Sequence, residues 1–166
     1  MTIAEYFINL NLPKELITFL LAILPVTELR LSIPIALEIF HMPVWSAYLF
    51  SVLGNLVPLI LIIWLLDPIS NFLSKKINTF DRFFAWFFTH TRKIHESKFD
   101  KWGKDLAVII LIATPIPLIG GWSGAIAAFV FGIPFKKGLP LIIIGSLLAG
   151  IVVTILTLGI SNLIKL

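Results

Sequence analysis

Two uninterrupted apolar segments, residues 44–66 and 138–164, restrict the possible folds of this chain more than any other feature. Neither segment contains a charged residue. The hydrocarbon core of a bilayer is about 30 Å thick, and a helix of roughly 20 residues crosses it. The whole chain is 58% hydrophobic with a mean hydropathy of +1.02, well above the average of soluble domains. We therefore expect one all-α integral membrane domain, residues 1–166, in which both segments are transmembrane helices.

Two further apolar blocks, residues 15–40 and 105–133, are interrupted near their centres. Proline removes a backbone donor and crowds the preceding helical turn, so it tends to break a helix. Each arm beside such a break would have about 13 residues, roughly 20 Å, which is too short to cross. We predict two re-entrant helical hairpins, with breaks at Pro25, Pro34, Pro115 and Pro117.

The placement of positive charge supports hairpins that fold back. If residues 105–133 return to the face they left, ten of the thirteen lysines and arginines lie on one side, in the linker 67–104 and at Lys136 and Lys137. The positive-inside rule makes that side cytoplasmic. Both termini then lie on the external side of the cell membrane. The N-terminus lacks a basic region, so we expect no cleavable signal peptide.

The linker 67–104 has helical features of its own. Asp67-Pro68 is typical of a helix start. Five phenylalanines then repeat at helical spacing, at positions 80, 83, 84, 87 and 88. This pattern predicts an amphipathic helix lying in the cytoplasmic membrane interface. The alternative is a helix that packs against a partner subunit.

The two halves of the chain align with each other at an offset of 91 residues. Phe40-x-x-Pro43 matches Phe131-x-x-Pro134, Gly54 matches Gly145, and residues 53–58 match residues 144–149. The repeats are residues 13–66 and 105–164, and each consists of one hairpin and one spanning helix. A unit with a single net crossing must start its second copy from the opposite face. We therefore predict an inverted repeat, which in many transporters places the substrate site at broken helices near the midplane.

The stretch LPVTELRLSIP, residues 24–34, places Glu28 and Arg30 at the centre of the first hairpin. An arginine at the centre of a membrane helix costs about 2.5–3.5 kcal/mol on insertion scales. Residues two positions apart do not face each other on a regular helix. A broken backbone or the other hairpin must therefore orient this pair. It either binds a substrate or is an ion pair that only stabilises the hairpin.

The second hairpin contains TPIPLIGGWSG, residues 114–124, without any charge. Glycine allows close backbone approach, and we expect Thr27 to cap the returning arm of the first hairpin. If both returning arms start near the turns, two helix N-termini converge and form an anion site with Arg30. The alternative for the glycines is tight helix packing, and Asn55 either bonds another helix or lies on the polar path. The candidate substrate-binding residues are Thr27, Glu28, Arg30, Asn55, Gly120, Gly121, Trp122 and Ser123.

Other chemistry is not indicated by the sequence. There is no cysteine, and the three histidines lack metal-ligand spacing. No catalytic triad, carboxylate pair, phosphate loop or nucleic-acid motif is present. We expect no enzymatic activity, no metal, no cofactor and no nucleic-acid partner.

The motifs ELRLSIP, GN-x-x-P and P-x-P followed by GGWSGA, in this order around a basic linker, resemble the family described as putative small multidrug export proteins. That family is grouped in the wider DedA, or VTT, superfamily. The resemblance covers nearly the whole chain. It implies membrane transport, with superfamily relatives linked to polyprenyl-phosphate carriers or phospholipids and to the proton motive force.

These observations together predict a transporter or flippase for an amphipathic anion, with a phosphate-headed lipid as the favoured substrate. Arg30 and the helix N-termini would bind the phosphate, and Glu28 would orient Arg30 and exchange a proton. The alternatives are an exporter of drugs or cations with Glu28 as counter-ion, and a scaffold that transports nothing. Because four main elements are few to enclose a pathway, we expect a homodimer in the bilayer.

Overall fold

The computed structural model describes residues 12–76, 101–114 and 120–164, and these are almost entirely helical. The helices are α2 (Lys14–Ile23), α3 (Glu28–Pro34), the π-helical turn η1 (Ile35–Ile39), α4 (Val44–Lys76), α6 (Lys101–Ala113), α7 (Gly121–Val130) and α8 (Phe135–Ile164). No strand occurs in these three ranges, so the predicted all-α class is confirmed for them.

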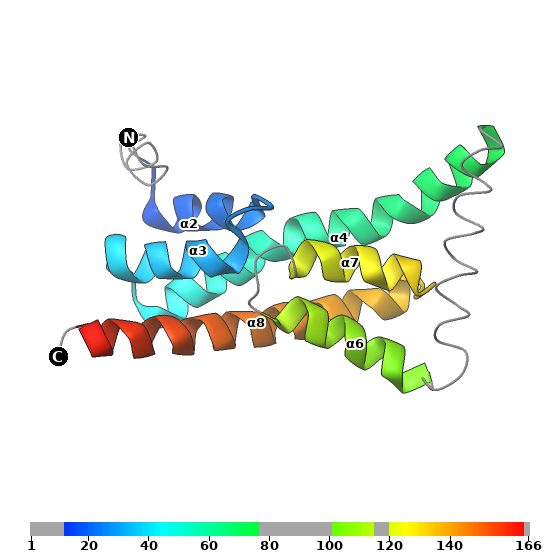
Figure 1. Cartoon of the computed structure of the whole chain (residues 1–166). Coiled ribbons are helices and arrows are strands. Elements are labelled where there is room, and N and C mark those ends of the chain that lie inside the picture. The colour runs from blue at the N-terminus through cyan, green and yellow to red at the C-terminus, as the bar shows by residue number, and fades with distance from the viewer. Residues whose placement is uncertain (1–11, 77–100, 115–119, 165–166) are drawn as a thin grey trace.

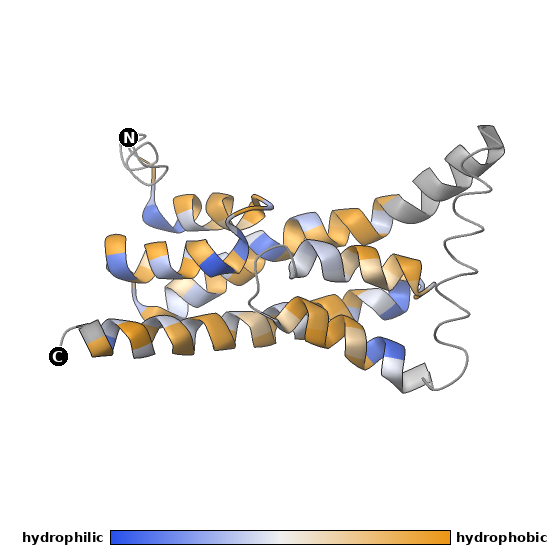
Figure 2. Cartoon of the chain, viewed as in Figure 1, coloured by the Kyte–Doolittle hydropathy of each residue, from blue (hydrophilic) through white to orange (hydrophobic). Residues whose placement is uncertain are grey.

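Helices α4 and α8 contain the two segments that are long and apolar enough to cross a membrane. These segments are Val44–Leu65, with 22 residues and a mean hydropathy of 2.2, and Phe135–Leu163, with 29 residues and a mean hydropathy of 2.7. Large apolar side chains along both helices are exposed, among them Trp64, Ile155 and Leu163. Figure 2 shows hydrophobic colour over most of both helices, with hydrophilic residues gathered at the two ends and near the middle of the molecule. Such a surface needs lipid or protein to cover it.

The boundaries of these helices correct one prediction. Helix α4 continues through Asp67 and Pro68 as far as Lys76, so the Asp-Pro pair does not start a new helix. Pro58 and Pro140 also lie inside α4 and α8. The φ angle of proline is itself helical, and a long helix can absorb the loss of one hydrogen bond. The predicted interfacial helix with its five phenylalanines, and the breaks at Pro115 and Pro117, lie outside the described residues.

Each of the two interrupted blocks contains a pair of short helices, α2 and α3 in the first and α6 and α7 in the second. Helix α2 has 10 residues, α6 has 13 and α7 has 10. At 1.5 Å per residue the longest of these is about 20 Å, less than the thickness of a hydrocarbon core. Chain segments of this length agree with the arms predicted from the sequence.

The break predicted at Pro34 is wrong. Residues 24–27 form the turn of the first hairpin, whereas Pro34 lies within a continuous helix with φ −57° and ψ −43°. Proline cannot donate the hydrogen bond that would close its turn, and the chain widens to a π-helix directly after it. There the Phe40 N–H donates to Ile35 O at 3.0 Å. The returning arm is therefore helical without interruption from Glu28 to Ile39.

The two helix pairs extend from opposite ends of the molecule, and the start of α3 lies near the end of α6 and the start of α7 at its middle (Figure 1). Helices α4 and α8 pack against each other along the centre. The first arms pack on the long helix of their own half, α2 on α4 and α6 on α8. The returning arms cross over, since α3 packs on α8 and α7 packs on α4. The helix contacts of the first half are thus repeated in the second half.

Individual residues follow the same offset of 91. A Cβ atom built on Gly54 would overlap the Phe19 backbone O of α2, and one built on Gly145 would lie 2.7 Å from Ile112 Cβ of α6. The equivalent glycines of the two long helices thus contact equivalent short helices. His41 and Gly132, also 91 residues apart, both have positive φ, 50° and 67°.

The buried faces of the first arms repeat as well. Ile17 and Leu21 in α2 are buried, as are Val108 and Ile112 at the same positions of α6. One hydrophobic core surrounds the first hairpin and another surrounds the second. This correspondence supports the predicted repeat.

The contact at Gly54 predicts the effect of adding a single methyl group. The methyl group added by Gly54→Ala would overlap the Phe19 backbone O and push α2 away from α4. We expect a loss of about 1–3 kcal/mol in the free energy of unfolding. Gly159, in α8, has no neighbouring atom within 4 Å of its Cβ direction. The matched variant Gly159→Ala should be neutral or stabilise by up to about 1 kcal/mol through helix propensity. Unfolding curves in detergent would measure both, and equal values would contradict the close packing of α2 on α4.

Candidate functional site

Glu28 and Arg30 lie where the start of α3 meets the end of α6 and the start of α7. Glu28 is only 8% exposed and begins α3 with a φ angle of 42°. This left-handed conformation costs a non-glycine residue roughly 1–2 kcal/mol. Such strained residues cluster at binding and switch sites. The backbone conformation at Glu28 allows the side chains of residues 28 and 30 to approach each other.

The two side chains form an ion pair that also contacts the second hairpin. Arg30 Nη2 lies 3.7 Å from Glu28 Oε2 and donates a hydrogen bond of 3.3 Å to the Thr114 backbone O. The Arg30 side chain is 20% exposed and that of Glu28 is 11% exposed. As predicted, both an irregular backbone and the other hairpin orient the pair. Because removing charges from water is costly, the geometry of a buried pair and its additional hydrogen bonds decide whether it is stable.

The N-terminus of α7 approaches the same carboxylate. The backbone N–H of Trp122 donates a hydrogen bond of 3.5 Å to Glu28 Oε1. The first turn of a helix has unpaired N–H groups and about half a positive charge. Glu28 is therefore an internal anion at a helix N-terminus.

Gly120 and Ser123 shape this end of α7. The Gly120 N–H donates to Ser123 Oγ at 2.8 Å, and Ser123 Oγ donates back to Gly120 O at 3.1 Å. A Cβ atom at position 120 would overlap Arg30 Nη2 and lie 2.8 Å from Glu28 Oε2. A side chain at position 120 would therefore have to displace the ends of the Arg30 and Glu28 side chains.

Thr27 does not cap α3, which corrects the expected role. It lies at the N-cap position with helical backbone angles and makes no capping hydrogen bond. Its hydroxyl instead donates to Leu21 O, at the end of α2, with a second acceptor at Leu24 O. Because φ and ψ at Thr27 are already helical, its side chain is turned away from the first N–H groups of α3. Thr27 stabilises the turn between the two arms.

Asn55 connects the two long helices. Its side chain is 1% exposed, and its Nδ2 donates to Ser146 Oγ at 3.3 Å. The predicted interhelical hydrogen bond is therefore present. The partners are 91 residues apart, so equivalent positions of the two halves contact each other directly. Asn55 Oδ1 has no hydrogen-bond partner among the described residues.

A small cavity lies beside these residues. Its volume is about 10 Å³, enough for the centre of one water molecule. This arrangement does not hold a phosphate group. The residues that line the cavity are Glu28, Leu29, Arg30, Asn55, Ile112, Thr114, Gly121, Ala149 and Val153.

Most candidate residues converge at this point of the fold. Glu28, Arg30, Gly120, Gly121 and Trp122 meet at the turns, whereas Thr27 and Ser123 stabilise helix ends; their assignment to substrate binding stays a prediction. Thr114 and Ser146, which contact Arg30 and Asn55, are not among the residues predicted from the sequence. Ser146 could have been found, because it is the counterpart of Asn55 in the repeat. No group of three metal-ligating side chains occurs in the described parts of the chain.

The family of this chain is identified by comparison with known proteins. No curated protein and no solved structure matches the chain. A family described as putative small multi-drug export protein matches residues 28–152. The matched region begins at Glu28 and includes Arg30, Asn55, Thr114, Gly120 and Trp122, whereas the turn residues 24–27 lie before it. The wider DedA grouping stays a prediction. Since the match covers most of the chain, this protein belongs to the family of putative small multi-drug export proteins.

Proposed function

We propose that this protein is a membrane transporter or flippase that moves an amphipathic anion, with phosphate-headed lipids as the substrate class. The observation that carries the proposal is the Glu28 carboxylate beside Arg30 and the N-terminus of α7. Two groups face this one anion: the Arg30 guanidinium, and the N-terminus of α7 through the Trp122 backbone N–H. A phosphate group needs the same partners.

In this proposal the hairpins are re-entrant and the two halves form an inverted repeat in the cell membrane. Support comes from the arms, each too short to cross, and from hairpins that extend from opposite ends of α4 and α8 (Figure 1). The equivalent contacts at Gly54 and Gly145, and the bond between Asn55 and Ser146, are those that an approximate two-fold axis would generate. The linker 67–104 would then be cytoplasmic, and both termini external. A homodimer belongs to the same proposal.

In this proposal the phosphate of the substrate takes the place of the Glu28 carboxylate during transport. The cavity beside Arg30 holds no more than one water molecule, so the hairpin turns must separate before a phosphate can enter. Phosphate would then replace the Glu28 carboxylate at Arg30 and Trp122 N–H. Proton exchange at Glu28 belongs to the same proposal, since a carboxylate without its partners is costly in low-dielectric surroundings.

The name of the family supports a second candidate, the export of drugs or other cations. Glu28 would then be the counter-ion of the substrate. A cation would have to displace Arg30 from the carboxylate, and Arg30 would lose its ion-pair partner in a buried site. The contacts of Glu28 therefore favour the anion, while the family name favours the drug. A scaffold without transport activity is the third possibility, and it predicts no flux of either kind.

The two charges separate these candidates. In proteoliposomes with a fluorescent polyprenyl phosphate, Arg30→Ala should reduce transport by roughly thirtyfold or more, because removing one partner of a buried charge pair costs about 2–5 kcal/mol. The double variant Glu28→Gln/Arg30→Ala leaves no unpaired charge and should also be inactive. Lys137→Ala is the matched control. It removes the salt bridge of 2.6 Å between Lys137 Nζ and Asp105 Oδ2, which does not involve Glu28 or Arg30. Full transport by the folded double variant would refute the role of Arg30. Loss of cationic-dye export in Glu28→Gln, with export retained in Arg30→Ala, would favour the second candidate.

The topology can be tested because the chain has no cysteine. Single cysteines at positions 14, 41, 104 and 136 would be labelled in intact cells with a membrane-impermeant thiol reagent. We expect labelling from outside at positions 14 and 41, and protection at positions 104 and 136 until the cells are opened. Labelling of positions 14 and 41 from opposite faces would show that the first hairpin crosses the membrane.

A further inference from the structure

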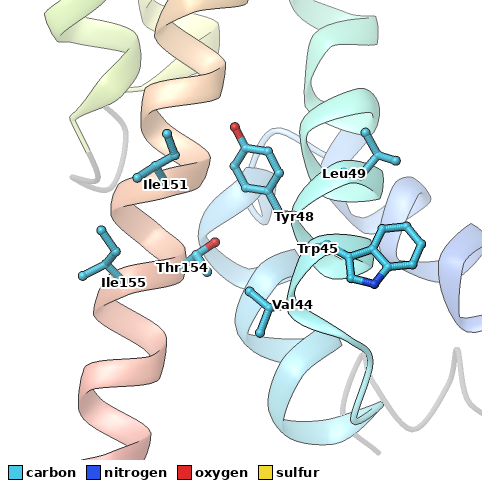
Figure 3. Close-up of a pocket in the computed structure, with 7 residues that line it drawn as sticks. All are labelled: Val44, Trp45, Tyr48, Leu49, Ile151, Thr154 and Ile155. Atoms are coloured by element: carbon cyan, nitrogen blue, oxygen red, sulfur yellow. The ribbon is translucent and has the colours of Figure 1, made fainter.

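A second, larger concavity lies between the long helices α4 and α8, away from the ion pair. Its volume is about 780 Å³, and it is shallow and widely open. Figure 3 shows Tyr48 and Val44 extending from α4 towards α8, where Ile151 and Ile155 follow each other along the helix. The lining residues are Val44, Trp45, Tyr48, Leu49, Ile151, Thr154 and Ile155; we call this concavity the α4–α8 groove.

The α4–α8 groove offers almost no polar group to an occupant. Its only two hydroxyl groups donate to carbonyl groups of α8, Tyr48 Oη to Leu147 O at 3.1 Å and Thr154 Oγ1 to Gly150 O at 2.7 Å. The remaining lining side chains are hydrocarbon or indole, and several of them are widely exposed. Ile155 is 64% exposed and Trp45 is 69% exposed. A polar or charged ligand would lose its hydration here without gaining partners.

The position of the groove limits what can fill it. It lies between the two segments long enough to span a membrane, so its open side faces the bilayer. It begins at the first turn of α4, where Trp45 has the exposure and chemistry typical of the aromatic belt at a membrane interface. From there it extends inward by about one turn on each helix. Its depth corresponds to the upper part of one leaflet, where acyl chains leave their headgroups.

A second copy of the chain fits this surface less well. Homodimers have isologous contacts, in which a surface patch meets the same patch of its partner. Such a contact centred on the α4–α8 groove would place one concavity against another and leave the space unfilled. An acyl chain is narrow and flexible and fills a groove of this shape.

We propose that the α4–α8 groove is a binding site for one acyl chain of a membrane lipid in the leaflet at the N-terminal end of α4. This site does not depend on the transport proposal, because it requires only that α4 and α8 lie in the bilayer. It has a defined inner wall. The Tyr48 ring packs on Gly150, where a Cβ atom would lie 2.7 Å from Tyr48 Cε2.

The groove and the polar cavity adjoin the same two turns of α8. Ala149 and Val153 line the cavity, and Ile151 and Thr154 line the groove.

Photo-crosslinking tests the site on the full-length protein in vesicles. The probe is a phosphatidylcholine with a diazirine in its upper acyl chain, and the labelled peptides are mapped by mass spectrometry. We expect labelling of Ile151 and Ile155 several-fold above that of Leu61, which is 47% exposed on α4 outside the groove. Filling the groove with Thr154→Trp should reduce this labelling to the level of Leu61. The matched variant Leu61→Trp should leave it unchanged.

Two results would overturn the proposal. One is equal labelling of groove and control positions, which would mean that lipids contact the whole surface without preference. The other is rapid disulfide formation between two copies of an Ile155→Cys variant together with absent lipid labelling, which would assign the groove to a subunit contact. Thermal unfolding of Thr154→Trp would be measured in parallel, and Ile151→Phe offers a smaller filling variant if the tryptophan variant does not fold. Loss of transport with intact labelling would affect the proposed function only.

Discussion

The contact between the Glu28–Arg30 pair and the second hairpin determines how the rest of the molecule can be arranged. The Glu28 carboxylate is buried, and the Arg30 side chain is four-fifths covered. Both have partners in the second half, because the Trp122 backbone N–H donates to Glu28 and Thr114 O accepts from Arg30. The start of α3 therefore lies against the end of α6 and the start of α7. This meeting in turn places one short arm of each hairpin across the long helix of the other half.

Close backbone packing is the second condition for this arrangement. Gly54 and Gly145 let α2 and α6 approach the long helices, and Gly120 lets the second hairpin approach the charges. In a lipid environment apolar contact with lipid competes with apolar contact between helices, so small residues that allow close packing are important for association. The strained backbone at Glu28 is retained because surrounding contacts fix its position. Rigid packing around one irregular residue is consistent with a site that opens by moving whole hairpins.

Much of this fold could be predicted because the membrane imposes simple length and charge rules. The spans in α4 and α8, the two short arms of each block and the meeting of Glu28 with the other hairpin all follow from such rules. The details that failed are those that depend on local alternatives of similar energy. Pro34 and Asp67-Pro68 occur inside helices, because proline has helical φ and long helices tolerate one missing hydrogen bond. The Thr27 side chain could either accept a hydrogen bond from the first N–H groups of α3 or donate one to the end of α2. It donates to Leu21 O in α2. The α4–α8 groove had no signal in the sequence, since its residues resemble any lipid-facing surface.

The bond between Asn55 and Ser146 has a consequence for how the two halves can differ. In an assembly of two identical polypeptides, a residue on the symmetry axis meets its own copy, and a charged hairpin would bring two carboxylates and two guanidiniums into one dry space. Here both halves belong to a single chain, so equivalent positions can carry different residues. The position equivalent to Arg30 is Gly121. One half supplies the charges, and the other supplies the glycines and amide groups that receive them. Covalent linkage thus permits a division of labour that strict symmetry forbids, and the two directions of hairpin opening need not have equal energy.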